Sequence, residues 1–275
     1  MSQPLIAAWE LEEALEGRRP PRLLDCRARL GDSDAGHGLW WKAHLPGSHH
    51  LDLDRDLAGP PGEGGRHPLP RQEAFTATLQ RLGVAPDMPV VVYDDMGGQL
   101  AAARAWWMLA CWAGHPDVRV LDGGIQAWLG HGGELREGDA VASRPTDWTP
   151  DYRDTAWVTA AAVASSESGL KLDARSRARF RGEVEPIDPV AGHIPGAVCR
   201  PSTENLGEDG RFKNPRRLAE ELPRAEEGVA YCGSGVTACH TILAYAVAGR
   251  PLPRLYPGSW SEWIRDPARP VATGD

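Results

Sequence analysis

The residues of this chain that are best suited to chemistry lie in one short loop. Cys232 is followed by Gly233-Ser234-Gly235, and Val236-Thr237 then lead into an apolar helical pattern. The residues before the cysteine, Gly228 to Tyr231, have the apolar and aromatic character of a buried strand. The sequence therefore predicts a thiol at the carboxyl end of a strand, facing a helix N-terminus, where open α/β sheets bind their ligands.

The backbone of this loop suits a negatively charged sulfur. Two glycines let the chain turn its N–H groups inward, and the following helix favours an anion at its N-terminus. Such a loop could hold a thiolate, a persulfide or a bound anion. An inert cysteine in an ordinary turn is the simpler interpretation of an isolated Cys232. A cysteine-dependent phosphatase is disfavoured, because Ala238 stands where that class places its phosphate-binding arginine.

The elements that position the loop occur twice. Each half alternates short apolar strands, such as 90–93 and 118–121, with helical patterns, such as 99–113 and 236–248. This alternation predicts α/β domains, each with a parallel sheet covered by helices on both faces. We expect a first domain at 1–142, a linker at 143–155 and a second domain at 156–275. Four blocks recur in the same order, pairing Leu24–Arg27 with Leu172–Arg175, His44–Ser48 with His193–Ala197, Val91–Asp94 with Val229–Cys232, and Leu121–Trp128 with Tyr256–Trp263.

The first copy lacks the nucleophile. Asp94 stands at the position of Cys232, and a carboxylate cannot attack a sulfane sulfur, so we predict that the first domain is catalytically silent. Asp25 with Arg27, and Asp173 with Arg175, are predicted to form structural pairs at strand ends.

The amino-acid composition of the chain disfavours several classes of binding partner. The 30 basic and 38 acidic residues give a net charge of −8, which disfavours nucleic acid and anionic membranes. The N-terminal residues lack a signal-peptide pattern, and the longest apolar run, near 105–114, is too short to span a bilayer. We therefore expect no membrane partner. The five cysteines contain no CxxC pair, so we expect neither disulfides nor a metal site, and a reducing, cytoplasmic location.

The loop from Cys232 to Ala238 resembles the active-site loop of the rhodanese superfamily. The likeness covers nearly the whole chain and includes His193–Gly196 and Tyr256–Trp260. It implies two tandem rhodanese-like domains and a sulfurtransferase without cofactors. Sulfur would pass from a small anionic donor, through a Cys232 persulfide, to cyanide or a thiol such as a thioredoxin-like protein. The C-G-S-G-V-T loop is similar to members that use 3-mercaptopyruvate, whereas members that prefer thiosulfate usually carry C-R-K-G-V-T.

The resemblance also assigns roles to residues. It implies a Ser–His–Asp arrangement of Ser234, His67 and Asp54 beside the catalytic Cys232. His67 lies in a Gly/Pro-rich loop that the second copy lacks, and this loop is expected to reach the second domain. The predicted substrate-binding residues are Arg179, Gly233, Gly235, Val236 and Thr237.

Arg179 is expected to hold the donor through two hydrogen bonds of its guanidinium group. Many mercaptopyruvate enzymes carry a second arginine nine positions later, where this chain has Asp188. Without the resemblance, an ordinary surface position is the simpler interpretation of His67 and of Asp54, and a surface arginine in a basic run is the alternative for Arg179. Three other functions stay open: a thiosulfate:cyanide sulfurtransferase, a persulfide carrier for a protein acceptor, and a scaffold without catalytic activity.

Overall fold

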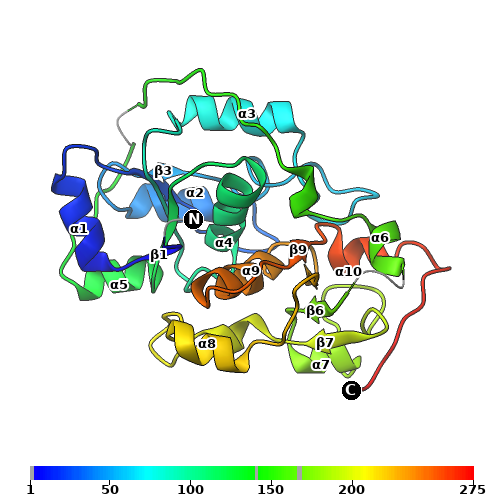
Figure 1. Cartoon of the computed structure of the whole chain (residues 1–275). Helices are drawn as coiled ribbons and strands as arrows, with labels where there is room; N and C mark the ends of the chain where they lie inside the picture. Colours follow the sequence, from blue (N-terminus) through cyan, green and yellow to red (C-terminus); the bar gives the residue numbers. More distant parts are fainter. Residues whose placement is uncertain (1–2, 140–141, 166–168) are drawn as a thin grey trace. The chain divides into compact units, whose positions relative to one another are not determined.

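The chain folds around two parallel β-sheets, one from each half of the sequence (Figure 1). The computed structural model describes residues 3–139, 142–165 and 169–275. None of its helices is both long enough and apolar enough to cross a membrane. Contacts divide the chain into unit 1, with the chain up to Gly59, Pro70–Arg153 and Glu208–Phe212, and unit 2, with Pro60–Leu69, Asp154–Gly207 and Lys213–Asp275.

Unit 1 contains a five-stranded sheet in the order β1-β5-β4-β2-β3. The strands predicted at 90–93 and 118–121 are present as β4 and β5, and β4 is buried along its whole length. The helix predicted at 99–113 is α4, continued by the π-helical segment η1. The elements in chain order are β1 (Leu5–Ile6), α1 (Ala8–Glu16), β2 (Arg22–Asp25), α2 (Ala35–Lys42), β3 (His49–His50), α3 (Gln72–Arg81), β4 (Val90–Tyr93), α4 (Ala101–Trp106), η1 (Trp107–Trp112), β5 (Val118–Leu121) and α5 (Gly124–Gly130).

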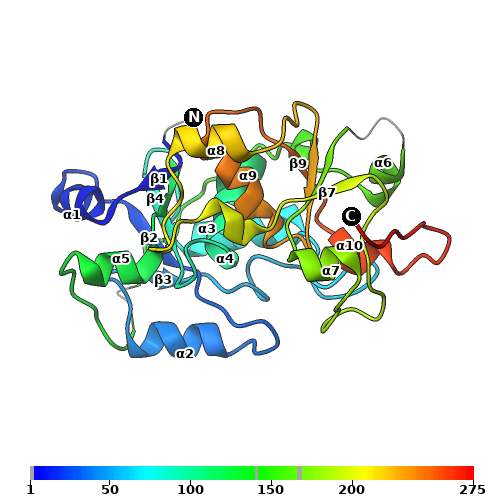
Figure 2. The same ribbon diagram turned by 90° about the horizontal axis from the view of Figure 1, so that it is seen from below.

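Unit 2 contains a four-stranded sheet in the order β7-β6-β8-β9. Its helices α8 and α9 lie side by side in both views (Figures 1 and 2). The helix predicted at 236–248 is present as α9. The elements in chain order are η2 (Asp154–Ala156), α6 (Ala160–Ala164), β6 (Lys171–Asp173), α7 (Arg177–Arg181), β7 (Ala197–Cys199), η3 (Ser202–Asn205), α8 (Pro215–Glu221), β8 (Val229–Tyr231), α9 (Ala238–Val247), β9 (Arg254–Leu255) and α10 (Ser259–Trp263).

The two sheets repeat one topology, as the duplicated blocks predict. Read from the opposite edge, β9-β8-β6-β7 of unit 2 corresponds to β5-β4-β2-β3 of unit 1. The edge strand β1 has a reduced counterpart in unit 2, where Trp157 forms a single parallel bridge to Leu255.

The repeated blocks Leu24–Arg27 and Leu172–Arg175 each form a buried ion pair at the end of a strand. In unit 1 the Arg27 guanidinium donates to both carboxylate oxygens of Asp25, with a shortest distance of 2.6 Å. Arg175 binds Asp173 in the same way in unit 2, also at 2.6 Å. Each arginine's backbone N–H also donates to its aspartate at 3.0 Å. These pairs fix the chain where it leaves β2 and β6.

The segment between the repeats is packed for most of its length. In the predicted linker 143–155, the Thr146 amide donates to the Gln80 carbonyl at 3.1 Å, and the Arg153 amide donates to the Trp112 carbonyl at 2.8 Å. Residues 146–153 therefore pack with unit 1.

Two short segments join the unit formed mainly by the other half of the sequence. Residues 208–212 join unit 1, where the Phe212 amide donates to the Asp122 carboxylate at 2.8 Å. Residues 60–69 join unit 2, where the Arg66 amide donates to Ser261 Oγ at 3.1 Å. The long loop of the first repeat is thereby part of the unit that contains Cys232.

Candidate active site

The nucleophile loop begins where β8 ends. Cys232 is the first residue after the strand and is only 3% exposed. Its amide donates to Ser259 Oγ at 3.1 Å, and its carbonyl accepts from the Trp260 amide at 3.0 Å. The next carbonyl, of Gly233, accepts from the Ser261 amide at 2.9 Å. The turn at the start of α10 therefore fixes the backbone on which the thiol is carried.

One glycine in the loop is required by its conformation. Gly235 has φ +77°, in the left-handed region, and a Cβ there would lie 2.3 Å from the Pro257 carbonyl oxygen. A larger residue would have to move either the loop or the Pro257 backbone. Gly235 thus lets the nucleophile loop pass close to the turn that leads into α10.

The structure brings two members of the predicted Ser–His–Asp arrangement together. His67, from loop 60–69, places Nδ1 2.8 Å from Ser234 Oγ, and Ser234 is buried two residues after Cys232. Asp54 belongs to unit 1, in the turn after β3, where its amide donates to the Asp52 carboxylate at 2.8 Å. Its pairing with His67 stays a prediction.

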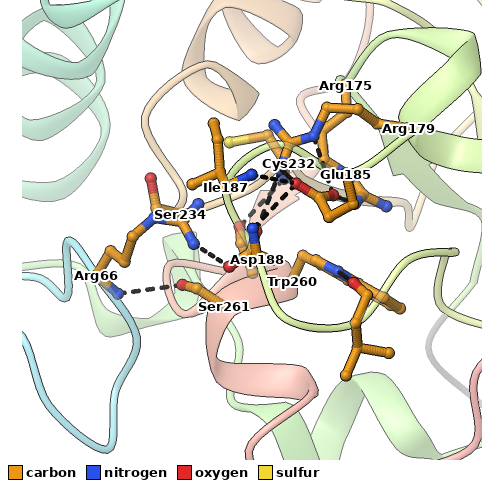
Figure 3. A network of polar contacts seen from close by, with 12 residues as sticks. Arg66, Arg175, Arg179, Glu185, Ile187, Asp188, Cys232, Ser234, Trp260 and Ser261 are labelled. Atoms are coloured by element: carbon orange, nitrogen blue, oxygen red, sulfur yellow. Dashed lines mark hydrogen bonds and ion pairs between the residues drawn. The ribbon is translucent and has the colours of Figure 1, made fainter. Parts of the chain in front are cut away.

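Arg179 lies beside the nucleophile loop, as predicted, but its paired donors are already used. Nε and Nη2 donate to the two carboxylate oxygens of Glu185 at 3.0 and 2.7 Å, and Nη2 also reaches Asp188 at 3.1 Å (Figure 3). Among the described residues, Nη1 has no hydrogen-bond partner. Nε and Nη2 are therefore engaged by acids and Nη1 remains for an anion, so the two-bond contact of Arg179 with a donor stays a prediction.

Glu185 is the acid that holds Arg179 in place. Burial alone raises the pKa of Glu185, but hydrogen bonds from Arg179 and from the amides of Asp188 and Ile187 outweigh burial. The net effect is a pKa below its ordinary value of 4.5, so the side chain is charged at neutral pH. Glu185 Oε2 also lies 3.3 Å from Nη1 of Arg175. The guanidinium group of Arg175 lies over the Trp260 ring.

Arg66 is a site residue that the sequence interpretation missed. Its Nη1 forms an ion pair with Asp188 Oδ1, while Asp188 Oδ2 accepts from Arg179 (Figure 3). A Cβ built on Gly233 would lie 2.8 Å from Nη2 of Arg66. The signal available in the sequence was its place next to His67, in the loop expected to reach the second domain.

The matching loop of the first copy contains a buried carboxyl group. The buried Asp94 carboxylate accepts from the amides of Met96, Gly98 and Ala102 at 2.9, 2.8 and 3.3 Å. Burial raises the pKa of Asp94 more than these hydrogen bonds lower it. This carboxyl group stands at the repeat position where the second copy carries the Cys232 thiol.

Comparison with known proteins agrees with this duplicated arrangement. The model of the rhodanese-like domain matches residues 7–131 and again 159–266. The chain belongs to the rhodanese-like family. It is 50% identical to a Pseudomonas aeruginosa protein named "Probable 3-mercaptopyruvate sulfurtransferase", over 100% of this chain and 99% of that protein. It is 42% identical to a Mycobacterium tuberculosis protein named "Putative thiosulfate sulfurtransferase SseB", over 99% and 98% of the two chains.

A solved structure gives the same result for the fold. The 3-mercaptopyruvate sulfurtransferase from Leishmania major superposes with a TM-score of 0.85 at 30% identity, covering 97% of this chain and 76% of that one. The predicted family and the predicted fold of two tandem rhodanese-like domains are confirmed. Because these full-length relatives are named sulfurtransferases, the chain is an enzyme of the sulfurtransferase class.

Proposed function

We propose that this chain moves a sulfane sulfur from 3-mercaptopyruvate to a thiol or cyanide acceptor through a persulfide on Cys232. The observation that supports 3-mercaptopyruvate as the donor most directly is the 2.8 Å contact between His67 Nδ1 and Ser234 Oγ. Ser234 belongs to the nucleophile loop, and His67 belongs to loop 60–69. A nucleophile that holds the transferred group covalently divides the reaction into two steps, so ping-pong kinetics are expected.

In the first step the Cys232 thiolate attacks the donor sulfur. A sulfur–sulfur bond forms, the carbon–sulfur bond breaks, and its electron pair leaves on carbon as the enolate of pyruvate. This enolate must gain a proton, and the hydrogen-bonded Ser234 and His67 provide a proton-transfer pair beside the loop. Sulfite, which leaves from thiosulfate, needs no proton for its departure. The pair therefore favours a donor with a carbon leaving group.

In the second step the acceptor attacks the outer sulfur of the persulfide. The sulfur–sulfur bond to Cys232 breaks and the thiolate is restored, while the acceptor becomes a persulfide or, from cyanide, thiocyanate. Inward-facing N–H groups of the loop segment Gly233–Thr237 would stabilise the anionic sulfur between the steps. A thioredoxin-like protein would suit as the thiol acceptor, and a reducing cytoplasm would keep Cys232 in its thiol form.

Donor-selective loss of activity tests the proposed role of the pair. Ser234→Ala and His67→Gln should each lower kcat/KM for 3-mercaptopyruvate by about 10²- to 10⁴-fold, the usual range for general acid–base catalysis. Thiosulfate turnover should change far less, because sulfite leaves without a proton. Ser165→Ala, at an exposed position after α6, is the matched control. Equal losses with both donors would contradict the proton-transfer role.

A thiosulfate sulfurtransferase is the second candidate. Two arginines, Arg66 and Arg179, lie beside Gly233 and could pair with a compact dianion. Steady-state kinetics of the parent protein with both donors separate the candidates. A higher kcat/KM for 3-mercaptopyruvate supports the first, and a higher value for thiosulfate supports the second.

A further inference from the structure

Two guanidinium groups approach the nucleophile loop from different parts of the sequence. Arg179 comes from α7, and Arg66 comes from loop 60–69, which packs with the same unit. We propose that Arg66 is the second donor-binding arginine of this site and replaces a cation that position 188 does not supply. This inference rests on the proposed function, because it assigns the carboxylate of the sulfur donor to Arg66 together with Arg179.

The position of Arg66 supports this role. A Cβ on Gly233 would lie 2.8 Å from Nη2 of Arg66 and 3.6 Å from both Nη1 and Nη2 of Arg179. Both groups therefore border the space above the residue that follows Cys232. In the part of the chain that the structure describes, Nη2 of Arg66 and Nη1 of Arg179 form no hydrogen bond, so each leaves an N–H edge for an anion.

Asp188 holds the two arginines together. Its side chain is 3% exposed, with Oδ1 paired to Arg66 and Oδ2 paired to Arg179. Two guanidinium groups repel each other unless an anion lies between them, and Asp188 provides that anion away from the loop. An acid at this position cannot bind a donor carboxylate itself. It can instead hold in place the two guanidinium groups that bind the carboxylate. This explains how the site could bind the sulfur donor without an arginine at 188.

Gly233 is the third part of the arrangement. A side chain at this position would meet Nη2 of Arg66, so the end of the Arg66 side chain would have to shift away from the loop. A loop with arginine after the cysteine would carry its own cation and would displace Arg66. In this chain the cation comes from loop 60–69, and the nucleophile loop stays uncharged.

Kinetics with the anionic donor test the assignment. Arg66→Ala should lower kcat/KM for 3-mercaptopyruvate by about ten- to a hundredfold, mainly by raising KM, because a charge-assisted hydrogen bond is lost. Arg66→Lys should restore only part of this loss, because an ammonium group lacks the planar pair of donors. Arg216→Ala removes the same charge from an exposed position on unit 2 and should match the parent.

Alkylation of Cys232 tests the anion site independently of sulfur transfer. Iodoacetate carries a carboxylate and iodoacetamide is neutral, so the ratio of their rates measures the attraction of the site for an anion. Arg66→Ala should lower this ratio about tenfold while the iodoacetamide rate stays near that of the parent. Gly233→Ala should lower it by a smaller factor, because the added Cβ shifts the end of the Arg66 side chain.

The outcomes separate the two proposals. A lowered ratio in a protein that does not use 3-mercaptopyruvate would support the anion site and contradict the proposed donor. A ratio unchanged in both Arg66→Ala and Gly233→Ala, with melting temperatures like that of the parent, would overturn the role of Arg66.

Discussion

At the scale of single residues, three of the five cysteines lie where their thiols are held in the protonated form. Desolvation raises the pKa of the Cys111 thiol to about 12 and that of Cys199 to about 11, and it raises the pKa of Cys26 well above its ordinary value. Such thiols hold almost no thiolate at neutral pH, and the thiolate is the nucleophile. Cys239 is fully buried in α9, with its thiol 3.4 Å from the Gly235 carbonyl. Cys232 is the cysteine that lies between the end of β8 and the start of α9, so persulfide formation is expected there alone.

Glu185 makes the site sensitive to acid. Its pKa is lower in the folded protein than its ordinary value of 4.5, so its ionised form stabilises the fold. This contribution is fully present above pH 4.5 and is lost as the pH falls through the folded-state pKa. Glu185→Gln should therefore have a melting temperature that falls less than that of the parent between pH 7 and roughly pH 4. Glu220→Gln, an exposed control, should follow the parent, and an acid response of Glu185→Gln as steep as the parent's would contradict this account.

At the scale of elements, the two strand-to-helix loops follow equivalent strands but carry different groups. The loop after β4 binds the Asp94 carboxylate through three amides, whereas the loop after β8 carries Cys232. Removing the carboxylate leaves buried N–H groups without an acceptor, at about 1–3 kcal/mol for each group.

Asp94→Ala should consequently lower the melting temperature by several degrees. Below that temperature, sulfur transfer for each folded molecule should stay within about twofold of the parent, because the first copy has no thiol. Thermal unfolding and steady-state kinetics of the same preparation would measure both effects. Complete loss of turnover with an unchanged melting curve would mean that Asp94 takes part in catalysis.

The elements were predictable where local pattern decides them. The apolar run 90–93 and the repeated strand-end pairs identified the sheets, and the glycines around Ser234 identified the nucleophile loop. Arg66 was not predictable from local pattern, because its role depends on loop 60–69 packing with a unit formed mainly by residues far along the chain. The contacts of Asp188 were not predictable for a related reason. Its charge alone excludes a donor carboxylate, while its two ion pairs show what it positions instead.

At the scale of the whole molecule, duplication has produced two sheets with one topology, with Asp94 after β4 and Cys232 after the equivalent strand β8. Each unit also incorporates a short segment from the other half of the sequence, 208–212 in unit 1 and 60–69 in unit 2. The second of these contains Arg66 and His67, so the candidate active site includes residues from both repeats. A fragment that starts after the linker would contain Cys232 without these two side chains.

The central claim is that this duplicated chain carries sulfur on Cys232. After incubation with 3-mercaptopyruvate and removal of excess donor, intact-protein mass spectrometry should show one added sulfur atom, and peptide mapping should place it on Cys232. Cyanide should remove it, and Cys232→Ser should never acquire it. A persulfide that persists in Cys232→Ser, or that maps to Cys239, would contradict the account.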